Sequence, residues 1–132
     1  MSRTSLVLLI AAVLTLAVSA PAHHSLGATY DGNQTVTLKG KIAQLLLRNP
    51  HSFLHIDVVD EAGKTVRWSL EWRSAGSLGQ QGIKRDTLKA GEEVIITCNP
   101  SRTPGDTRGA LVTLHRTSDN FGWGTRPGEV VE

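Results

Sequence analysis

The chain has 132 residues, with 14 Lys and Arg against 12 Asp and Glu and a single cysteine. This length suits one domain with a modest core and excludes two. The near-balanced charge, without a basic run or a basic patch interleaved with aromatic residues, argues against a nucleic acid as partner. The lone Cys98 excludes an internal disulfide and a cysteine-cluster metal site.

The first 22 residues have the features of a secretory signal peptide. Arg3 supplies a short positive start, fifteen mostly apolar residues run from Leu6 to Ala20, and Ala20-Pro21-Ala22 matches a signal-peptidase site. A permanent spanning helix needs roughly 20 apolar residues, so this run is short for one. We therefore expect cleavage after Ala22, a periplasmic or secreted mature chain and no permanent membrane anchor. The alternative is an uncleaved N-terminal anchor.

Cleavage after Ala22 would leave a free α-amino group on His23, directly followed by His24. The amine and the imidazole of one histidine can chelate a metal ion together, and the second imidazole adds a further nitrogen. Nitrogen-rich ligand sets favour copper(II). His23 and His24 are therefore candidate metal ligands, and the alternative is a chain terminus that binds nothing.

Five β-rich segments separated by turn clusters follow. We expect strands over residues 36–47, 51–59, 65–72, 93–98 and 110–115, with a hairpin turn over 60–64. Residues 74–82 hold three glycines, so the insert after the third strand should be irregular or a short helical turn. This order predicts an all-β fold, a small five-stranded OB-like antiparallel barrel. A small open sandwich is the competing architecture.

The expected organisation is a signal peptide over residues 1–22, one β-barrel domain over 23–116 and an irregular C-terminal tail over 117–132. In the fourth strand, Cys98 continues the apolar face of Val94 and Ile96. We therefore expect a buried thiol that packs as a small apolar side chain.

The second and third expected strands each alternate apolar and polar residues, as half-buried strands do. Their apolar faces coincide across the five-residue turn only if odd-numbered residues pair with odd-numbered residues. A register that pairs Asp57 with Arg67 meets this condition. It also places Phe53 directly opposite Glu71, with His51 diagonal to Glu71.

His51, Glu71 and Arg73 therefore share one polar sheet face with Phe53 beside them, and this face is the second candidate site. His55 lies on the same face, about 13 Å from His51, so these two histidines are not expected to bind one metal ion together. The alternatives are structural: Glu71 as a solvated carboxylate or an arginine's partner, and His51 as a residue that caps a turn.

The same residues belong to a set of short motifs. Each motif alone is common, but their order and spacing in combination are characteristic. These motifs are His23-His24-Ser25, Tyr30-Asp31, Val36-Thr37-Leu38-Lys39-Gly40, Asn49-Pro50-His51, Trp68 with Glu71, Arg85 with Leu88-Lys89 and Gly91, Val94, and Val112-Thr113-Leu114. In this set the chain resembles the family of small exported bacterial proteins catalogued as domain-of-unknown-function family 6152, over nearly all of the mature sequence. The resemblance implies export and a small β-barrel-like domain, and it implies no enzyme activity.

Two classes of function fit these observations. The first is a periplasmic metal-binding module for copper, with His23, His24 and His51 as nitrogen ligands. In this module Glu71 is either an axial ligand or a residue that contacts one of the ligands. The second is a metal-free binding module that uses the polar face, including Phe53 and Arg73, for a small ligand or a protein partner. An enzyme is disfavoured, because the sequence shows no Ser/His/Asp arrangement, no closely spaced carboxylate pair and no phosphate-binding glycine loop.

Overall fold

The computed structural model describes residues 26–124, so residues 1–22 and the candidate ligands His23 and His24 lie outside the described part. The elements in chain order are α2 (Leu26–Thr29), β1 (Val36–Leu46), β2 (Ser52–Val59), β3 (Thr65–Trp72), α3 (Ala75–Gln80), β4 (Glu93–Pro100), β5 (Arg108–Arg116) and β6 (Gly122–Trp123). Within residues 26–124 no helix reaches the length and apolar character needed to cross a bilayer.

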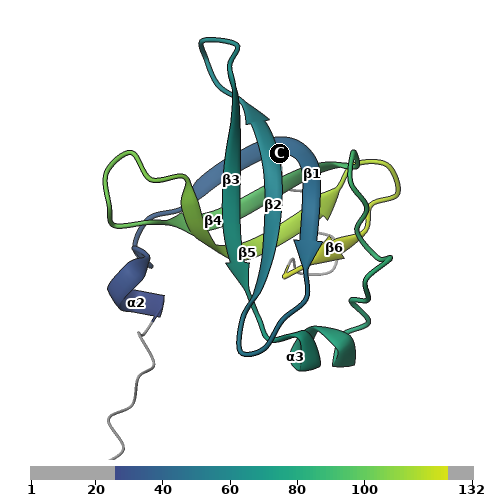
Figure 1. Ribbon diagram of the computed structural model, residues 1–132. Helices are drawn as coiled ribbons and strands as arrows, with labels where there is room; N and C mark the ends of the chain where they lie inside the picture. Colours follow the sequence, from purple (N-terminus) through teal and green to yellow (C-terminus); the bar gives the residue numbers. More distant parts are fainter. Residues whose placement is uncertain (1–25, 125–132) are drawn as a thin grey trace, which may run out of the picture.

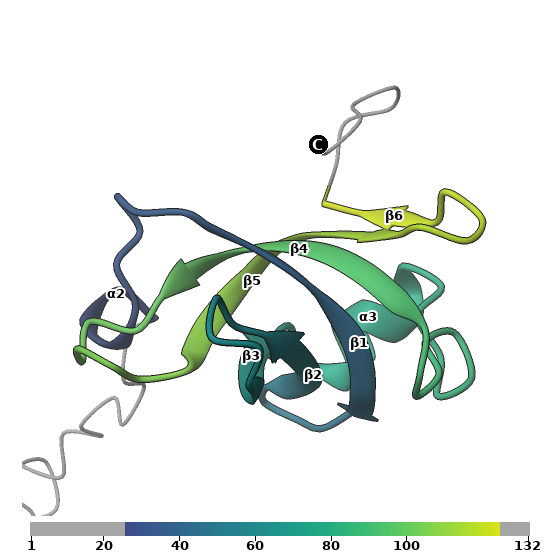
Figure 2. The same cartoon turned by 90° about the horizontal axis from the view of Figure 1, so that it is seen from above.

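The strands form one sheet in the order β3-β2-β1-β4-β5-β6, and a parallel pairing between β3 and β5 closes the first five into a barrel. The β2–β3 turn and α3 lie at opposite ends of this barrel (Figure 1). Figure 2 shows α2 and β6 on opposite sides of it. The predicted all-β, OB-like barrel with a short helix between the third and fourth strands is confirmed.

The register predicted for the central hairpin is also confirmed. Asp57 pairs with Arg67, and Phe53 lies directly opposite Glu71. The Arg67 guanidinium donates two hydrogen bonds to the Asp57 carboxylate, with Nε 2.6 Å from Oδ1. The buried residues of the hairpin are the even-numbered ones, such as Leu54 and Leu70, because period-2 alternation places them all on the inner face.

Strand β1 departs from simple alternation. Its pairing with β2 shifts by one residue between Ile42 and Gln44, so Ala43 is the extra residue of a β-bulge. Before the bulge the even-numbered Leu38 and Ile42 are buried, whereas after it the odd-numbered Leu45 packs against the core. The bulge thereby keeps apolar side chains inside the barrel as the strand bends.

The core fills the barrel with side chains from all five main strands, from α3 and from the connector after it. Its buried members are Leu38, Ile42, Leu54, Ile56, Leu70, Trp72, Leu78, Ile83, Leu88, Val94, Ile96, Cys98, Leu111 and Leu114. Cys98 is completely buried, as predicted, and this burial raises the pKa of its thiol to about 11. The thiol therefore stays protonated at neutral pH and acts as a small apolar side chain.

The tail differs from the irregular segment expected after residue 116. Gly122 and Trp123 form the short strand β6, which pairs with His115 and Leu114 of β5. The turn before it is held by Arg116, whose guanidinium donates to both Asp119 carboxylate oxygens. These side-chain bonds form a tight turn that a glycine-rich composition does not reveal.

Candidate functional site

Glu71 is the centre of the polar face, near the end of β3. Its Oε1 lies 2.8 Å from Nδ1 of His51, an ion-pair contact, and its Oε2 accepts a hydrogen bond from the Tyr30 hydroxyl at 2.7 Å. The Glu71 side chain is only 18% exposed. A half-buried carboxylate needs polar partners for both oxygens, and these two residues supply them.

The contact with Glu71 favours one tautomer of His51. A carboxylate only accepts, so a hydrogen bond at this contact needs the hydrogen on Nδ1 of His51. In a neutral imidazole Nε2 then keeps its lone pair and can bind a metal ion or accept a proton. The His51 side chain is 36% exposed, so it remains accessible from outside the barrel.

The backbone next to His51 is fixed by hydrogen bonds to residues before and after it in the chain. Ser52, the first residue of β2, is fully buried, and its backbone N–H donates to the Arg73 carbonyl at 3.0 Å. Its hydroxyl accepts from the Arg48 N–H and donates to the Arg48 carbonyl. These bonds fix the turn between β1 and β2 against the end of β3, and so place His51 next to Glu71.

Tyr30 ties the N-terminal segment to the same carboxylate. Its side chain is 4% exposed, and burial, reinforced by the hydrogen bond to Glu71 and by the charge of Glu71, raises its pKa well above the usual range. The hydroxyl therefore stays protonated and remains a donor. The preceding helix α2 is tied to the barrel as well, because Arg102 donates to the Gly27 carbonyl at 3.0 Å.

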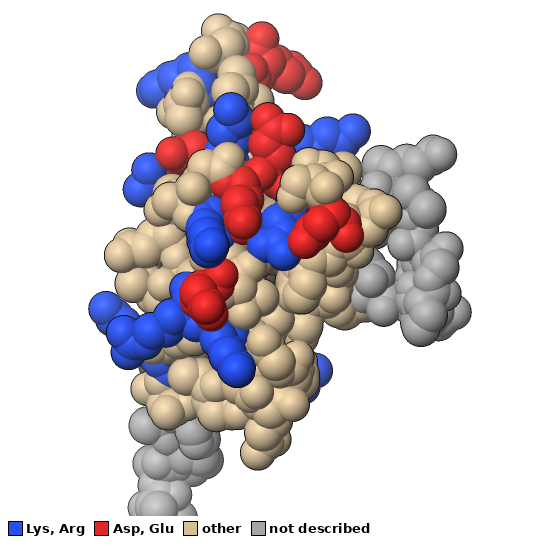
Figure 3. All heavy atoms as spheres, turned by 90° about the vertical axis from the view of Figure 1, so that its right-hand side faces the viewer, with Lys and Arg blue, Asp and Glu red and all other residues tan. Residues whose placement is uncertain are grey.

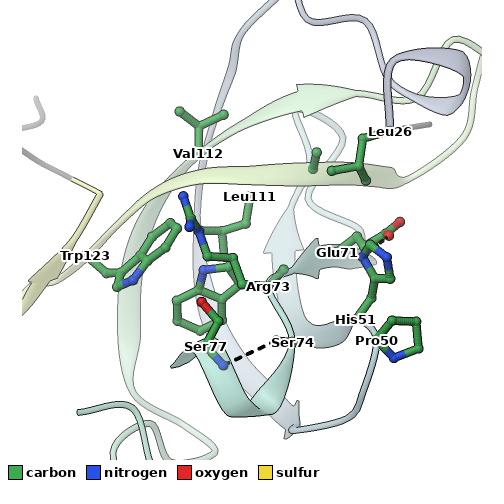
Figure 4. A pocket seen from close by; sticks show the side chains of 12 residues that line it. Leu26, Pro50, His51, Glu71, Arg73, Ser74, Ser77, Leu111, Val112 and Trp123 are labelled. Atoms are coloured by element: carbon green, nitrogen blue, oxygen red, sulfur yellow. Dashed lines mark hydrogen bonds and ion pairs between the residues drawn. The ribbon is translucent and has the colours of Figure 1, made fainter. Parts of the chain in front are cut away.

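A groove of about 590 Å³ opens where β3 and β5 separate, directly after the pairing of Glu71 with Ala110. This volume lies within the range typical of small-molecule sites. His51, Glu71 and Leu26 lie toward one end of the groove in Figure 4. Arg73 and Trp123 lie toward the other end, so the groove runs from α2 to β6.

The second end of the groove is built around Trp123. The Trp123 indole donates to Oε1 of Gln81 at 2.6 Å, and its ring packs edge-on against Trp72 with centroids 4.9 Å apart. The Arg73 guanidinium lies 5.6 Å from the Trp123 ring centroid, a cation–π distance. Trp72 is almost completely buried, yet its indole N–H has no hydrogen-bond partner among the described residues.

The structure brings some of the predicted site residues together and separates others. His51 and Glu71 are in direct contact, and Arg73 lines the same groove. Phe53 is paired with Glu71 across β2 and β3 but does not line the groove. Within residues 26–124 no group of three or more His, Cys, Asp or Glu side chains could hold a metal ion.

The strand patterns do not reveal three residues of the site: Tyr30, Trp72 and Trp123. Tyr30 is part of a family motif and is the only tyrosine of the chain, but nothing in the local pattern links it to Glu71. Trp72 lies on the apolar face of β3, as its alternation predicts, although its position at the strand end also exposes it to the groove.

The charges of the outer surface are mixed. On the face shown in Figure 3, basic and acidic side chains alternate, and neither sign forms a large patch there. Several of the charged residues are paired, including Arg116 with Glu92 at 2.9 Å. This face therefore offers no extended field of one sign.

The structure is a small closed β-barrel with a groove between β3 and β5, and the contacts of Glu71 with Tyr30 and His51 lie at one end of this groove. The family model for a family of unknown function (DUF6152) matches residues 11–111. The chain belongs to this family, as the motifs in its sequence indicated. Searches of the curated proteins and of the solved structures found no match.

Proposed function

We propose that this protein is an exported metal-binding module that takes copper(II) at the His51 end of the groove. Export to the periplasm or to the medium would follow cleavage after Ala22. The observation that carries the proposal is the chain of contacts in which Glu71 accepts a hydrogen bond from Tyr30 and lies 2.8 Å from Nδ1 of His51. Metal-ligating histidines typically donate their second ring N–H to a carboxylate in this way, which fixes the tautomer and the ring orientation.

Glu71 supports the metal site from behind His51 and is not a ligand itself. Its Oε2 already accepts the Tyr30 hydrogen bond at 2.7 Å, and its Oε1 lies 2.8 Å from Nδ1 of His51. Binding a metal through either oxygen would break one of these contacts in a half-buried position. The ligand offered by the barrel is therefore Nε2 of His51.

The remaining ligands in this proposal come from His23 and His24. Leu26 lines the same groove as His51 and Glu71, and His24 precedes Leu26 by two residues. Two residues of extended chain span at most about 7 Å. In this proposal the α-amine and imidazole of His23 and the imidazole of His24 complete the site at His51.

The test is a copper(II) titration of the chain that begins at His23, with variants that remove single ligands. We expect His51→Ala and acetylation of the His23 α-amine each to weaken binding by about tenfold or more, because each removes one nitrogen ligand. His55→Ala is the matched control, since His55 lies nearby on β2 but its partner across the hairpin is Ser69. Equal copper affinity in the parent, the acetylated chain and His51→Ala would refute the proposal.

A metal-free binding module is the second candidate. It is supported by the other end of the groove, where the exposed Arg73 has no acidic partner among the described residues and lies beside apolar side chains. A ligand held there needs no metal. Titrations in the presence of a chelator therefore separate the two candidates.

A further inference from the structure

We infer that the Arg73 end of the groove binds the carboxylate of a small acid with an apolar body. This inference deepens the second candidate function by naming the class of ligand, and it does not depend on the metal site. It rests on two hydrogen-bond donors without an acceptor among the described residues, in side chains that both lie against Trp123, and on the apolar residues that line the groove beside them.

The first donor is the Trp72 indole N–H. Trp72 is 4% exposed and lines the groove, but the indole nitrogen has no acceptor within residues 26–124. Buried indole N–H groups usually find a partner, since leaving one unpaired costs free energy. The neighbouring Trp123 shows the usual arrangement, because its own N–H donates to Gln81. The missing partner at Trp72 is therefore an acceptor.

The second donor is the Arg73 guanidinium, which lies over the same Trp123 ring. Several arginines of the barrel have carboxylate partners, for example Arg67 with Asp57 and Arg108 with Asp106. Arg73 has none in the described part of the chain. A planar guanidinium matches a carboxylate through two parallel hydrogen bonds, so an anionic acceptor satisfies it best.

The walls of the groove select the rest of the ligand. Leu111 and Val112 of β5 both line the groove, but in Figure 4 only Leu111 points from the strand toward Arg73, whereas Val112 points away and is left exposed. Glu71 lies toward the far end with both oxygens engaged, so its charge does not face the bound anion directly. An apolar body against Leu111 and the neighbouring Ala110, with its carboxylate at Arg73, uses both features.

The experiment uses phenylacetate as the probe, with the metal removed by a chelator. Heteronuclear NMR follows the three indole N–H signals of the chain, which come from Trp68, Trp72 and Trp123. We expect phenylacetate to shift the Trp72 signal in the direction of a stronger hydrogen bond. The neutral phenylacetamide and inorganic phosphate should bind more weakly, because the first lacks the charge and the second lacks the apolar body.

Two variants and one control complete the test. Arg73→Gln, at an exposed position, should weaken phenylacetate binding about tenfold or more, as expected for a lost charged hydrogen bond. Trp72→Phe keeps an aromatic ring but removes the N–H, and it should weaken binding as well. Arg85→Gln, an exposed arginine outside the groove, should leave the affinity unchanged. The inference is refuted if either groove variant binds phenylacetate as tightly as the parent, or if phenylacetamide binds equally well.

Discussion

Replacing Tyr30 by phenylalanine isolates the hydrogen bond that links the N-terminal segment to the site. The substitution removes one hydroxyl oxygen and leaves the ring of a buried residue in place. Oε2 of Glu71 then loses its donor at 2.7 Å, in a side chain that is 18% exposed. The carboxylate is too enclosed for full hydration, so the loss appears as reduced stability of the folded chain.

The magnitude follows from the charge of the acceptor. A hydrogen bond to a charged group contributes about 1.5–3 kcal/mol, and the partial exposure of Glu71 lets water recover some of it. We therefore expect Tyr30→Phe to lower the free energy of unfolding by about 1.5 kcal/mol. Urea unfolding at pH 7, followed by tryptophan fluorescence, measures this change. The slope of the free energy of unfolding against urea concentration should stay the same.

A double-mutant cycle with Glu71→Ala shows whether the loss comes from this pair. Since Glu71→Ala removes the acceptor, Tyr30→Phe should cost far less in that background, with a coupling energy of about 1 kcal/mol or more. A coupling energy below about 0.5 kcal/mol would show that the hydroxyl and the carboxylate do not stabilise each other.

Three further predictions concern the rest of the barrel. Because burial and Glu71 raise the pKa of Tyr30, the folded protein should lose stability as the pH rises above about 10, where an unfolded tyrosine ionises and the buried one does not; an absorbance titration of this single tyrosine that gives an ordinary pKa would contradict it. Cys98, whose pKa burial raises to about 11, should react with iodoacetamide at pH 8 only after unfolding, and equal rates in native and denatured protein would be incompatible with the structure. Gly40→Ala should destabilise the barrel by about 1–3 kcal/mol, because a Cβ there would lie 2.5 Å from the Asp57 carbonyl oxygen. Gly76→Ala in α3 is the control, since its Cβ meets open space and should not destabilise the fold. Urea unfolding of both variants measures the difference.

The central hairpin is predictable from the sequence because one of its faces is buried. A strand with period-2 alternation and one buried face tolerates no shift by a single residue. The pairing of Asp57 with Arg67 selects one register from the allowed set, and this register brings His51 close to Glu71. The amino-acid sequence alone therefore predicts this half of the candidate site.

The other half depends on contacts between distant parts of the chain. Tyr30 and Glu71 are 41 residues apart, and they meet only because the closed barrel brings the residue that follows α2 next to β3. The groove exists because β3 and β5 pair for three residues and then diverge. Trp123 reaches the groove through β6, a two-residue strand too short to leave a pattern in the sequence. None of these features has a local signal.

In our proposal His51, supported by Glu71 and Tyr30, completes a metal site with the histidines that precede Leu26. Native mass spectrometry of the chain that begins at His23, mixed with one equivalent of copper(II) and a competing chelator, tests this most directly. We predict that His55→Ala retains copper as this protein does, and that His51→Ala retains a clearly smaller fraction. Copper retained equally by His51→Ala, or by none of the three proteins, would contradict the account.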